Sequence, residues 1–438
     1  MNGLKMQVAK IQTLLTLSLL ASHTIAAVEY CGFEQGGGIC PDANTCCRMQ
    51  DGSSGCIASD MGSYNATCCP DGSSGCPVGY SCRNEAFDCL ATGPSEFKDD
   101  LVKVLPRYQL CRAEEISQLH GLSIGDSGAR LAYYSSHGPI ESIPVASEIE
   151  MIFIFIHGAN RNADDYFCSG SAAVQLQTQY ANVLLISPRF FEQSDAPADP
   201  SHLVWEDDTD GSWRYGADSI SPAPISSFTT LDAMVDLLWN RFPNLIQMTL
   251  AGHSAGGQTI QRWALLTSSW RESRMRAVVA NPSSYAYLTP LRFIGGYWRL
   301  PKKGDVDCPQ YNKWKWGLDD GGDNEVPYSD AALQNKTGVV KRFKSRQVLY
   351  LAGGLDRCNV SQAGWCHSHG LETTCMDELQ GSNRFERNAR YISSLRVLGI
   401  WENHARRLIE GVGHDHSLMF QSQIGLESVF GKWNGEDS

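Results

Sequence analysis

Residues 245–257 read Leu-Ile-Gln-Met-Thr-Leu-Ala-Gly-His-Ser-Ala-Gly-Gly. The first half of this stretch is an apolar, β-like run, and a helix-compatible segment, 258–266, follows directly. The pentapeptide Gly-x-Ser-x-Gly, centred on Ser254, stands between them, in the strand–turn–helix setting that exposes a serine hydroxyl on a tight turn. Gly252 and Gly256 are expected there because such a turn leaves no space for a Cβ atom beside the serine. The pentapeptide also occurs by chance, so its weight depends on the rest of the chain.

Apolar runs alternate with helical patterns from about residue 107 onward. The unbroken apolar run 151–156 is typical of a strand buried on both faces of a parallel sheet. Further strands are expected at 183–186, 277–280, 348–351 and 407–409. Helices are expected at 228–242 (with Ser227 as its N-cap), 384–400 and 416–430. This alternation predicts an α/β fold, a mostly parallel sheet with helices on both faces.

The segment 283–345 breaks this rhythm, because it is rich in Trp, Tyr, Gly and Asp and lies between two predicted strands. One interpretation is a lid-like insertion over the site, since loops at that edge of a sheet carry specificity. The other is an irregular surface excursion without a role in substrate binding. The sequence leaves both open.

Two further residues stand where a serine nucleophile needs partners. The serine requires a base, and the base requires an orienting carboxylate. Asp356 follows the predicted strand 348–351. His414 follows the predicted strand near 407–409. Both lie at carboxyl ends of strands, the edge at which sites form in open α/β sheets. We therefore predict a triad of Ser254, Asp356 and His414, in the chain order serine, acid, histidine.

Other residues compete for the roles of base and acid. His416 lies two residues beyond His414, but the glycines precede His414, and His416 is expected to begin the last helix. The alternative acids follow no strand-like run; they are Asp319, Asp320, Asp323 and Glu372.

A tetrahedral intermediate needs two hydrogen-bond donors for its oxyanion. The N–H of Ala255 is the first candidate, because Ala255 directly follows the serine. The second donor is expected in the loop after 151–156, where the N–H groups of Ala159 and Asn160 are the alternatives. His157 begins this loop and is expected to be structural rather than a proton carrier.

The first 27 residues have the pattern of a secretory signal. Lys5 and Lys10 form a basic start, 11–21 is uncharged and mostly apolar, and Ala26 and Ala27 offer a cleavage site. No stretch reaches the roughly 20 apolar residues that a membrane-spanning helix needs. We therefore expect a protein that is secreted or within the secretory pathway, without a membrane span. Glycosylation sequons, relevant in a eukaryotic secretory route, begin at Asn65, Asn335 and Asn359.

The chain is acidic, with a formal net charge of −12 over 438 residues. Loss of the signal segment removes two lysines and no acid, so the remaining chain is more acidic still. Such a chain lacks the basic footprint through which proteins bind nucleic acids or anionic lipids. A nucleic-acid partner is therefore not expected.

Ten of the 16 cysteines lie between residues 31 and 89, a segment with few aliphatic residues. An even number of cysteines in a secreted chain predicts disulfides, which stabilise a segment that cannot bury a core. The hexapeptide Asp-Gly-Ser-Ser-Gly-Cys occurs at 51–56 and again at 71–76, each time shortly after a Cys-Cys pair. The segment therefore contains an internal repeat.

The paired cysteines and the run Cys-Cys-Pro-Asp-Gly at 68–72 resemble granulin-type modules. The resemblance implies a stack of small hairpins held by disulfides. We assign 28–90 to this granulin-like module and 91–106 to a linker. The module is expected to bind a protein or carbohydrate partner, or to protect the N-terminus.

Residues 107–438 resemble α/β-hydrolases of a secreted or microbial group. The matching segments are 157–161, 252–258, 281–285 and 380–384. The resemblance implies the α/β-hydrolase fold and hydrolysis of an ester by a secreted serine hydrolase, with no metal or organic cofactor required. Peptidases and acyltransferases use the same triad and remain alternatives. A further alternative is a protein that binds through its cysteine-rich module and has an inert hydrolase domain.

The segment 366–369, Cys-His-Ser-His, together with Cys375 has side chains of the kinds that bind metals. In a secreted chain, disulfide formation by Cys358, Cys366 and Cys375 is the favoured interpretation, with the histidines exposed.

Overall fold

The computed structural model describes six short strands between residues 44 and 91 by their backbone, and residues 118–432 apart from 146–147, 208–211, 272, 303–304, 306, 320–325 and 359–367. The chain divides into two compact units, 1–107 and 108–438. The predicted signal segment lies outside the described residues, and so does the predicted linker after Ala91, which is the last residue of a described strand.

The described strands of the first unit form antiparallel pairs. They are β1 (Asn44–Arg48) with β2 (Ser54–Ala58), β3 (Ala66–Cys68) with β4 (Gly75–Pro77), and β5 (Tyr80–Cys82) with β6 (Cys89–Ala91). Each pair is short, and its residues are rich in cysteine. The small hairpins implied by the granulin resemblance are therefore present in the backbone.

An eight-stranded sheet forms the centre of the second unit. Its strands are β7 (His120–Ser123), β8 (Arg130–Ser135), β9 (Met151–Ile156), β10 (Val183–Arg189), β13 (Gln247–His253), β14 (Met275–Ala280), β17 (Gln347–Gly353) and β18 (His404–Ile409). Their order across the sheet is β18-β17-β14-β13-β9-β10-β8-β7. The neighbours from β10 to β18 pair in parallel, and β8 runs antiparallel to β10 and β7. The predicted, mostly parallel sheet is confirmed.

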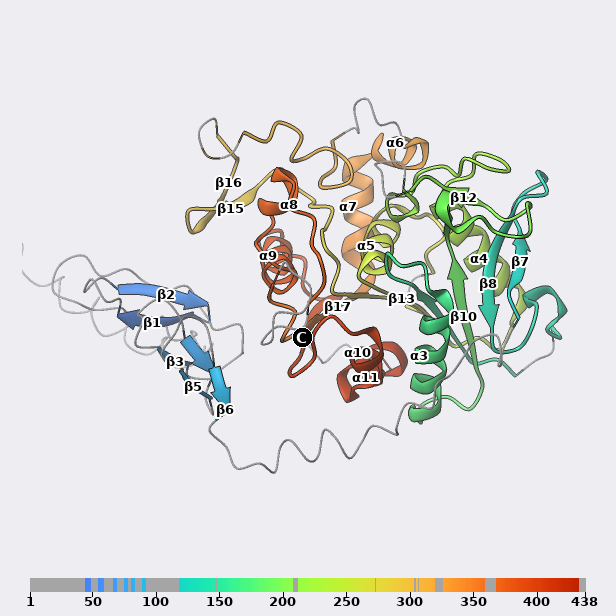
Figure 1. Cartoon of the computed structure of the whole chain (residues 1–438), viewed down its shortest axis with the longest axis horizontal. Coiled ribbons are helices and arrows are strands. Elements are labelled where there is room, and N and C mark those ends of the chain that lie inside the picture. The colour runs from blue at the N-terminus through green and yellow to red at the C-terminus, as the bar shows by residue number, and fades with distance from the viewer. Residues whose placement is uncertain are drawn as a thin grey trace, which may run out of the picture. The chain divides into compact units, whose positions relative to one another are not determined.

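Helices cover both faces of this sheet (Figure 1). They are α3 (Ala163–Leu176), α4 (Ser227–Arg241), α5 (Ala255–Leu266), α6 (Pro327–Leu333), α7 (Lys336–Ser345), α8 (Cys375–Glu378), α9 (Arg384–Val397), α10 (His416–Gln421) and α11 (Gln423–Phe430). The side chains of β9 alternate between the two faces. Ile152, Ile154 and Ile156 belong to the core that includes α4, α5, α7 and α9. Phe153 and Phe155 belong to the core that includes α3, α10 and α11. The unbroken apolar run is therefore explained by burial on both faces.

Several predicted boundaries were wrong. The N-cap of α4 is Ser226, whose side chain accepts a hydrogen bond from the N–H of Phe228, and not Ser227, which is the first helical residue. The predicted last helix is two helices, because Ser422 ends α10 and caps α11. Helix α9 ends at Val397 rather than at residue 400. Gly399, two residues beyond the helix, has a positive φ of 67°. The structure adds β7, β8 and α3, which the pattern did not predict.

The segment 283–345 contains two different parts. Its first part includes a hairpin of β15 (Arg292–Ile294) and β16 (Tyr297–Arg299). Its second part is helical, and Val339 and Phe343 of α7 are fully buried in the main core. The second part therefore belongs to the helical layer. That the first part covers the site remains a prediction.

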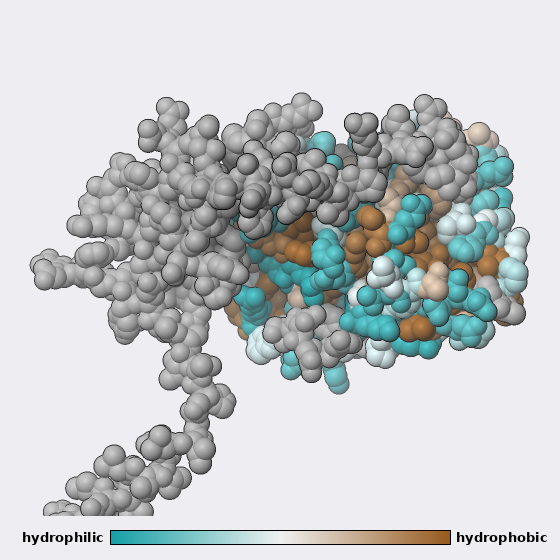
Figure 2. Space-filling model, turned by 90° about the horizontal axis from the view of Figure 1, so that it is seen from below, coloured by the Kyte–Doolittle hydropathy of each residue, from teal (hydrophilic) through white to brown (hydrophobic). Residues whose placement is uncertain are grey.

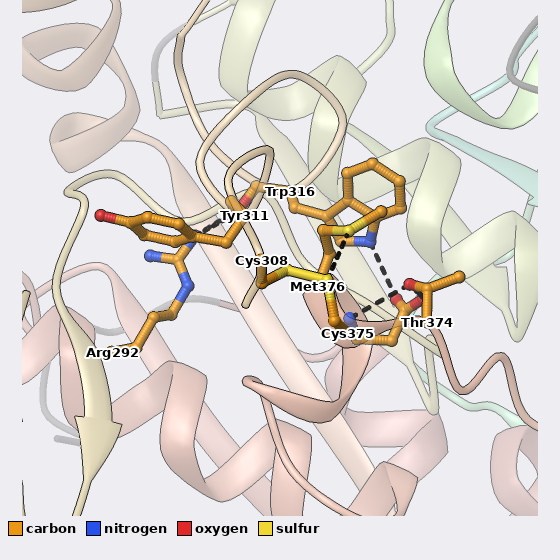
Figure 3. The surroundings of a disulfide bond; sticks show 8 residues. Arg292, Cys308, Tyr311, Trp316, Thr374, Cys375 and Met376 are labelled. Carbon is orange, nitrogen blue, oxygen red and sulfur yellow. Dashed lines mark hydrogen bonds between the residues drawn. A yellow bond between two sulfur atoms is a disulfide. The ribbon is translucent and has the colours of Figure 1, made fainter. Parts of the chain in front are cut away.

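A disulfide between Cys308 and Cys375 ties this segment to α8 (Figure 3). Beside it, Trp316 Nε1 donates a hydrogen bond to Asp377 Oδ1 at 2.9 Å. The two contacts join the segment to the loop that leads away from β17. Cys358 is also disulfide-bonded, whereas Cys366 and His367 lie outside the described residues.

The surface of the second unit is mixed. On the face in Figure 2, apolar patches reach the surface between hydrophilic residues.

Asn335, the first residue of one predicted sequon, is exposed and caps α7 through its side-chain oxygen. In the part of the chain that the structure describes, no helix is long and apolar enough to cross a membrane.

Candidate active site

Ser254 lies in the turn between β13 and α5, at the carboxyl edge of the sheet. Its backbone has φ 57° and ψ −119°, a conformation that a non-glycine residue adopts at a cost of about 1–3 kcal/mol. The N–H of Ser254 donates to the carbonyl of Ala280 at 2.9 Å, which fixes the turn against β14. Ser254 is partly exposed. The turn therefore presents a serine side chain in a strained conformation at the edge where sites form.

The two glycines of the pentapeptide are required by space. A Cβ atom on Gly252 would lie 2.2 Å from the carbonyl oxygen of Gly256. A Cβ atom on Gly256 would lie 2.3 Å from the carbonyl oxygen of Ile156. Both obstacles are backbone atoms, which cannot move aside as a flexible side chain can. The close packing of α5 against β13 and β9 thus depends on these glycines.

Asp356 and His414 are brought together although 58 residues separate them. His414 Nδ1 lies 2.7 Å from Asp356 Oδ2, and the two side chains are 5% and 0% exposed. The pairing of β17 with β18 continues past the strand ends to place them. The N–H of Gly354 donates to the carbonyl of Ile409 at 2.9 Å.

Asn281 joins the two loops through its side chain. Its Oδ1 accepts a hydrogen bond from the N–H of Gly353 at 2.9 Å, and its Nδ2 donates to the carbonyl of Gly413 at 3.2 Å. Gly353 lies three residues before Asp356, and Gly413 directly precedes His414. The single buried amide of Asn281 therefore contacts both the loop that carries Asp356 and the loop that carries His414.

The other carboxylate oxygen of Asp356 is also held. Ser368 Oγ donates to Asp356 Oδ1 at 2.5 Å, and Arg384 Nη1 lies 3.8 Å from the same oxygen. Arg384 also donates to the carbonyls of His369 and Gly370 at 2.9 and 2.8 Å. Burial raises the pKa of Asp356 to about 6, against the lowering effect of Arg384 and Ser368. Sequence reasoning missed Ser368 and Arg384 as partners of the acid, although 380–384 was among the segments noted for their resemblance.

The surroundings of His414 favour its neutral form. Burial lowers its pKa well below the usual value, and the positive charge of Arg384 acts in the same direction. The rings of His253 and His369 lie 4.4 and 5.2 Å from the His414 ring, measured between centroids. His253 directly precedes Ser254, so this contact places His414 beside the turn that carries Ser254.

The predicted oxyanion loop also lies at this turn. Gly158 packs against Ser254, since a Cβ atom built on Gly158 would lie 3.7 Å from Ser254 Cβ. Ala159 and Asn160 follow and are exposed. Ala255, the other candidate donor, is the first residue of α5. Its N–H lies at a helix N-terminus, where the helix dipole favours negative charge.

The competing histidines have other partners. His157 is fully buried, its Nε2 accepts from the N–H of Phe190 at 3.0 Å, and its Nδ1 lies 2.8 Å from the carbonyl oxygen of Gly158. Burial lowers its pKa to about 3, as suits a structural residue. His416 begins α10, as predicted, and stacks on Tyr166 with ring centroids 4.0 Å apart.

The two competing acids that the structure describes have other partners. Asp319 is exposed and accepts from Asn312 and Lys336. Glu372 lies 3.6 Å from Arg214, and Asp320 and Asp323 lie outside the described residues.

The second unit combines a mostly parallel sheet, helices on both faces and a serine on a strand-to-helix turn at the sheet centre. This combination is that of the α/β-hydrolases. The described part of the second unit, within residues 118–432, has the α/β-hydrolase fold.

No protein-family model matches the chain. Three solved structures illustrate the likeness. Poly(aspartic acid) hydrolase-1 from Sphingomonas sp. KT-1 is 21% identical to this chain, with a TM-score of 0.47; the match covers 72% of this chain and 98% of that protein's chain. The LpqC poly(3-hydroxybutyrate) depolymerase from Bordetella parapertussis is 16% identical, with TM-score 0.46, covering 74% and 94%. The siderophore hydrolase EstB from Aspergillus nidulans is 12% identical, with TM-score 0.35, covering 73% and 96%.

The N-terminal region is similar to granulins, which confirms the predicted resemblance. A stretch of 73 residues is 37% identical to Homo sapiens progranulin, and covers 17% of this chain and 11% of progranulin. A stretch of 53 residues is 40% identical to Dictyostelium discoideum granulin, and covers 12% of this chain and 38% of that protein. The chain thus matches only a small part of each relative.

Proposed function

We propose that the protein is a serine hydrolase that cleaves carboxylic esters through an acyl-enzyme intermediate, with Ser254 as nucleophile, His414 as base and Asp356 as orienting acid. The observation that carries the proposal is the 2.7 Å contact between His414 Nδ1 and Asp356 Oδ2, beside a serine with φ 57°. A carboxylate on Nδ1 leaves Nε2 of the ring to accept a proton.

The reaction follows from these roles. The Ser254 hydroxyl attacks the ester carbonyl carbon while His414 Nε2 takes its proton, and the C=O electron pair moves onto oxygen to form a tetrahedral oxyanion. The N–H of Ala255 and an N–H of the 158–161 loop stabilise that oxyanion. The carbonyl re-forms, and the leaving alkoxide departs with the proton from His414. Water then attacks the acyl-enzyme with the same base, releasing the carboxylic acid and free Ser254.

The electrostatics of the pair suit this cycle. His414 must be neutral to accept a proton, and its lowered pKa keeps it neutral at physiological pH. Asp356 must be ionised to stabilise the transient imidazolium, and a pKa of about 6 leaves it ionised above that pH.

The protein is further proposed to act in or beyond the secretory pathway, on the strength of the signal pattern and the granulin-like segment.

A substrate panel tests the proposal. Full-length wild type and Ser254→Ala are assayed with p-nitrophenyl acetate, p-nitrophenyl butyrate and a p-nitroanilide, each with and without an added alcohol. Ester cleavage by wild type alone is the expected result. Cleavage of the anilide at a comparable rate would indicate a peptidase, and transfer to the alcohol in preference to water an acyltransferase. Equal turnover by wild type and Ser254→Ala would contradict the assignment of Ser254.

A further inference from the structure

Arg161 closes the turn that carries the candidate oxyanion donors. It has a positive φ of 55°, which is unusual for a residue other than glycine. Its side chain is only 20% exposed and lies between two carboxylates. Nη1 lies 2.7 Å from Glu192 Oε2, and Nε donates to Asp195 Oδ2 at 2.6 Å. The positive φ and the two partly buried ion pairs hold this arginine in one place.

The backbone and the side chain of Arg161 together fix two peptide planes. The N–H of Arg161 donates to the carbonyl of Gly158 at 3.1 Å, and its Nη1 donates to the carbonyl of Ala159 at 2.8 Å. In a planar trans peptide, the carbonyl and the following N–H point in opposite directions. Holding the Gly158 carbonyl therefore aims the N–H of Ala159, and holding the Ala159 carbonyl aims the N–H of Asn160. The guanidinium of Arg161 therefore orients the N–H of Asn160. The N–H of Ala159 depends instead on the backbone of Arg161 and on His157 Nδ1, which both contact the Gly158 carbonyl.

The charges around Arg161 favour a positional role over a direct electrostatic one. Glu192 and Asp195 together carry two negative charges against the single positive charge of the guanidinium. The cluster therefore offers no net positive charge to a nearby oxyanion.

The two acids are themselves fixed. Glu192 Oε1 accepts from Trp213 Nε1 at 2.9 Å, and Asp195 Oδ2 accepts from the N–H of Glu192 at 2.8 Å. Trp213 is fully buried. The network thus connects the loop at 158–161 to the core.

We infer that Arg161 is a positioning residue for the oxyanion hole: its guanidinium, held by Glu192 and Asp195, fixes the Ala159 carbonyl and thereby sets the direction of the Asn160 N–H. This inference rests on the proposed serine-hydrolase function. It adds to that function a residue that touches neither the ester nor the triad.

The test compares Arg161→Lys and Arg161→Asn with wild type on p-nitrophenyl acetate. Asn tolerates the left-handed backbone, so Arg161→Asn keeps the turn and removes the guanidinium. Misplaced donors weaken the transition state more than substrate binding, so kcat should fall about 10- to 100-fold while KM changes less than about twofold. Arg161→Lys keeps the charge but not the fork of donors, and should restore only part of kcat. Active sites are counted by titration with a fluorophosphonate, so that kcat refers to folded enzyme.

Arg271→Lys and Arg271→Asn are the matched controls, because Arg271 pairs with Asp236 at 2.7 Å and comes after α5, far along the chain from the turn. Their kcat should stay within twofold of wild type. A kcat for Arg161→Asn within twofold of wild type would overturn the inference, and if that variant does not fold, an unchanged kcat for Arg161→Lys would do so. A rise in the KM of Arg161→Asn with its kcat unchanged would also overturn the inference. If wild type itself cleaves no ester, the proposed function fails instead, and the two failures are thereby distinguished.

Discussion

Asn281 Nδ2 donates a hydrogen bond at 3.2 Å to the carbonyl of Gly413, the residue that precedes the proposed base. The same amide accepts from the N–H of Gly353 on the acid side. The distance between Asp356 and His414 is therefore set in part by Asn281, which directly follows the third strand, β14.

Replacing Asn281 by Asp should lower kcat by roughly tenfold or more. The Asp side chain keeps the acceptor for Gly353 but places a carboxylate oxygen against the Gly413 carbonyl, which misaligns the base loop. Asn388→Asp is the matched control, since Asn388 is also a buried amide that both donates and accepts, to Tyr285 and from Arg406. Both variants should lose stability in thermal unfolding, but only Asn281→Asp should lose kcat beyond that loss. Equal kcat in the two variants would refute the role of Asn281.

The pH dependence of kcat/KM should show an acidic limb at about pH 6. His414 is already neutral there because its pKa is lowered, whereas Asp356, with a pKa of about 6, becomes protonated as the pH falls and no longer stabilises the imidazolium. Activity should therefore rise with pH through this region and then level off. Initial rates measured from pH 4 to 8 at constant ionic strength check this. A limb centred above pH 7 would contradict it.

Arg384→Gln should move that limb to higher pH. The positive charge of Arg384 lowers the pKa of both Asp356 and His414, so its removal raises both values and moves the limb in one direction. Arg390→Gln is the control, because Arg390 lies on the same helix α9 but pairs with Glu386. A profile for Arg384→Gln that overlays wild type would show that its charge does not reach the pair.

Gly252→Ala should prevent the nucleophile turn from forming. The added methyl would lie 2.2 Å from a backbone oxygen, and overpacking of this kind typically costs about 1–3 kcal/mol or more. We expect a lower Tm together with loss of ester cleavage. Gly370→Ala is the comparison, because a Cβ atom there meets no atom within 4 Å. Equal Tm values for the two variants would be inconsistent with the packing described.

Replacing Cys308 and Cys375 together by Ala should lower the free energy of unfolding by about 2–4 kcal/mol, because the cross-link spans a separation of 67 residues. Thermal unfolding of the double variant beside wild type measures the effect. A double variant with an unchanged Tm would show that the contact of Trp316 with Asp377 suffices to hold the segment.

The sequence predicted those features that local pattern determines. The Gly-x-Ser-x-Gly turn, the buried strand 151–156 and the strand-end positions of Asp356 and His414 all follow from periodicity and order. The antiparallel strands β7 and β8 were missed; β7 has only four residues, and β8, with six, precedes the stronger apolar run of β9. The loops that carry Asp356 and His414 are contacted by residues that folding brings to them from elsewhere in the chain: Asn281, Ser368 and Arg384. The residues next to these three in the sequence do not reveal the contacts. The break at Ser422 was missed because the apolar pattern continues across it.

Covalent labelling tests most directly whether Ser254 is the nucleophile of a working triad. Wild type, Ser254→Ala and His414→Ala are treated with a fluorophosphonate, and the intact mass and the modified peptide are determined by mass spectrometry. The proposed triad predicts one phosphonyl group on wild type, located on Ser254, none on Ser254→Ala, and much slower labelling of His414→Ala. Absence of labelling in wild type, or equal labelling of Ser254→Ala, would contradict it.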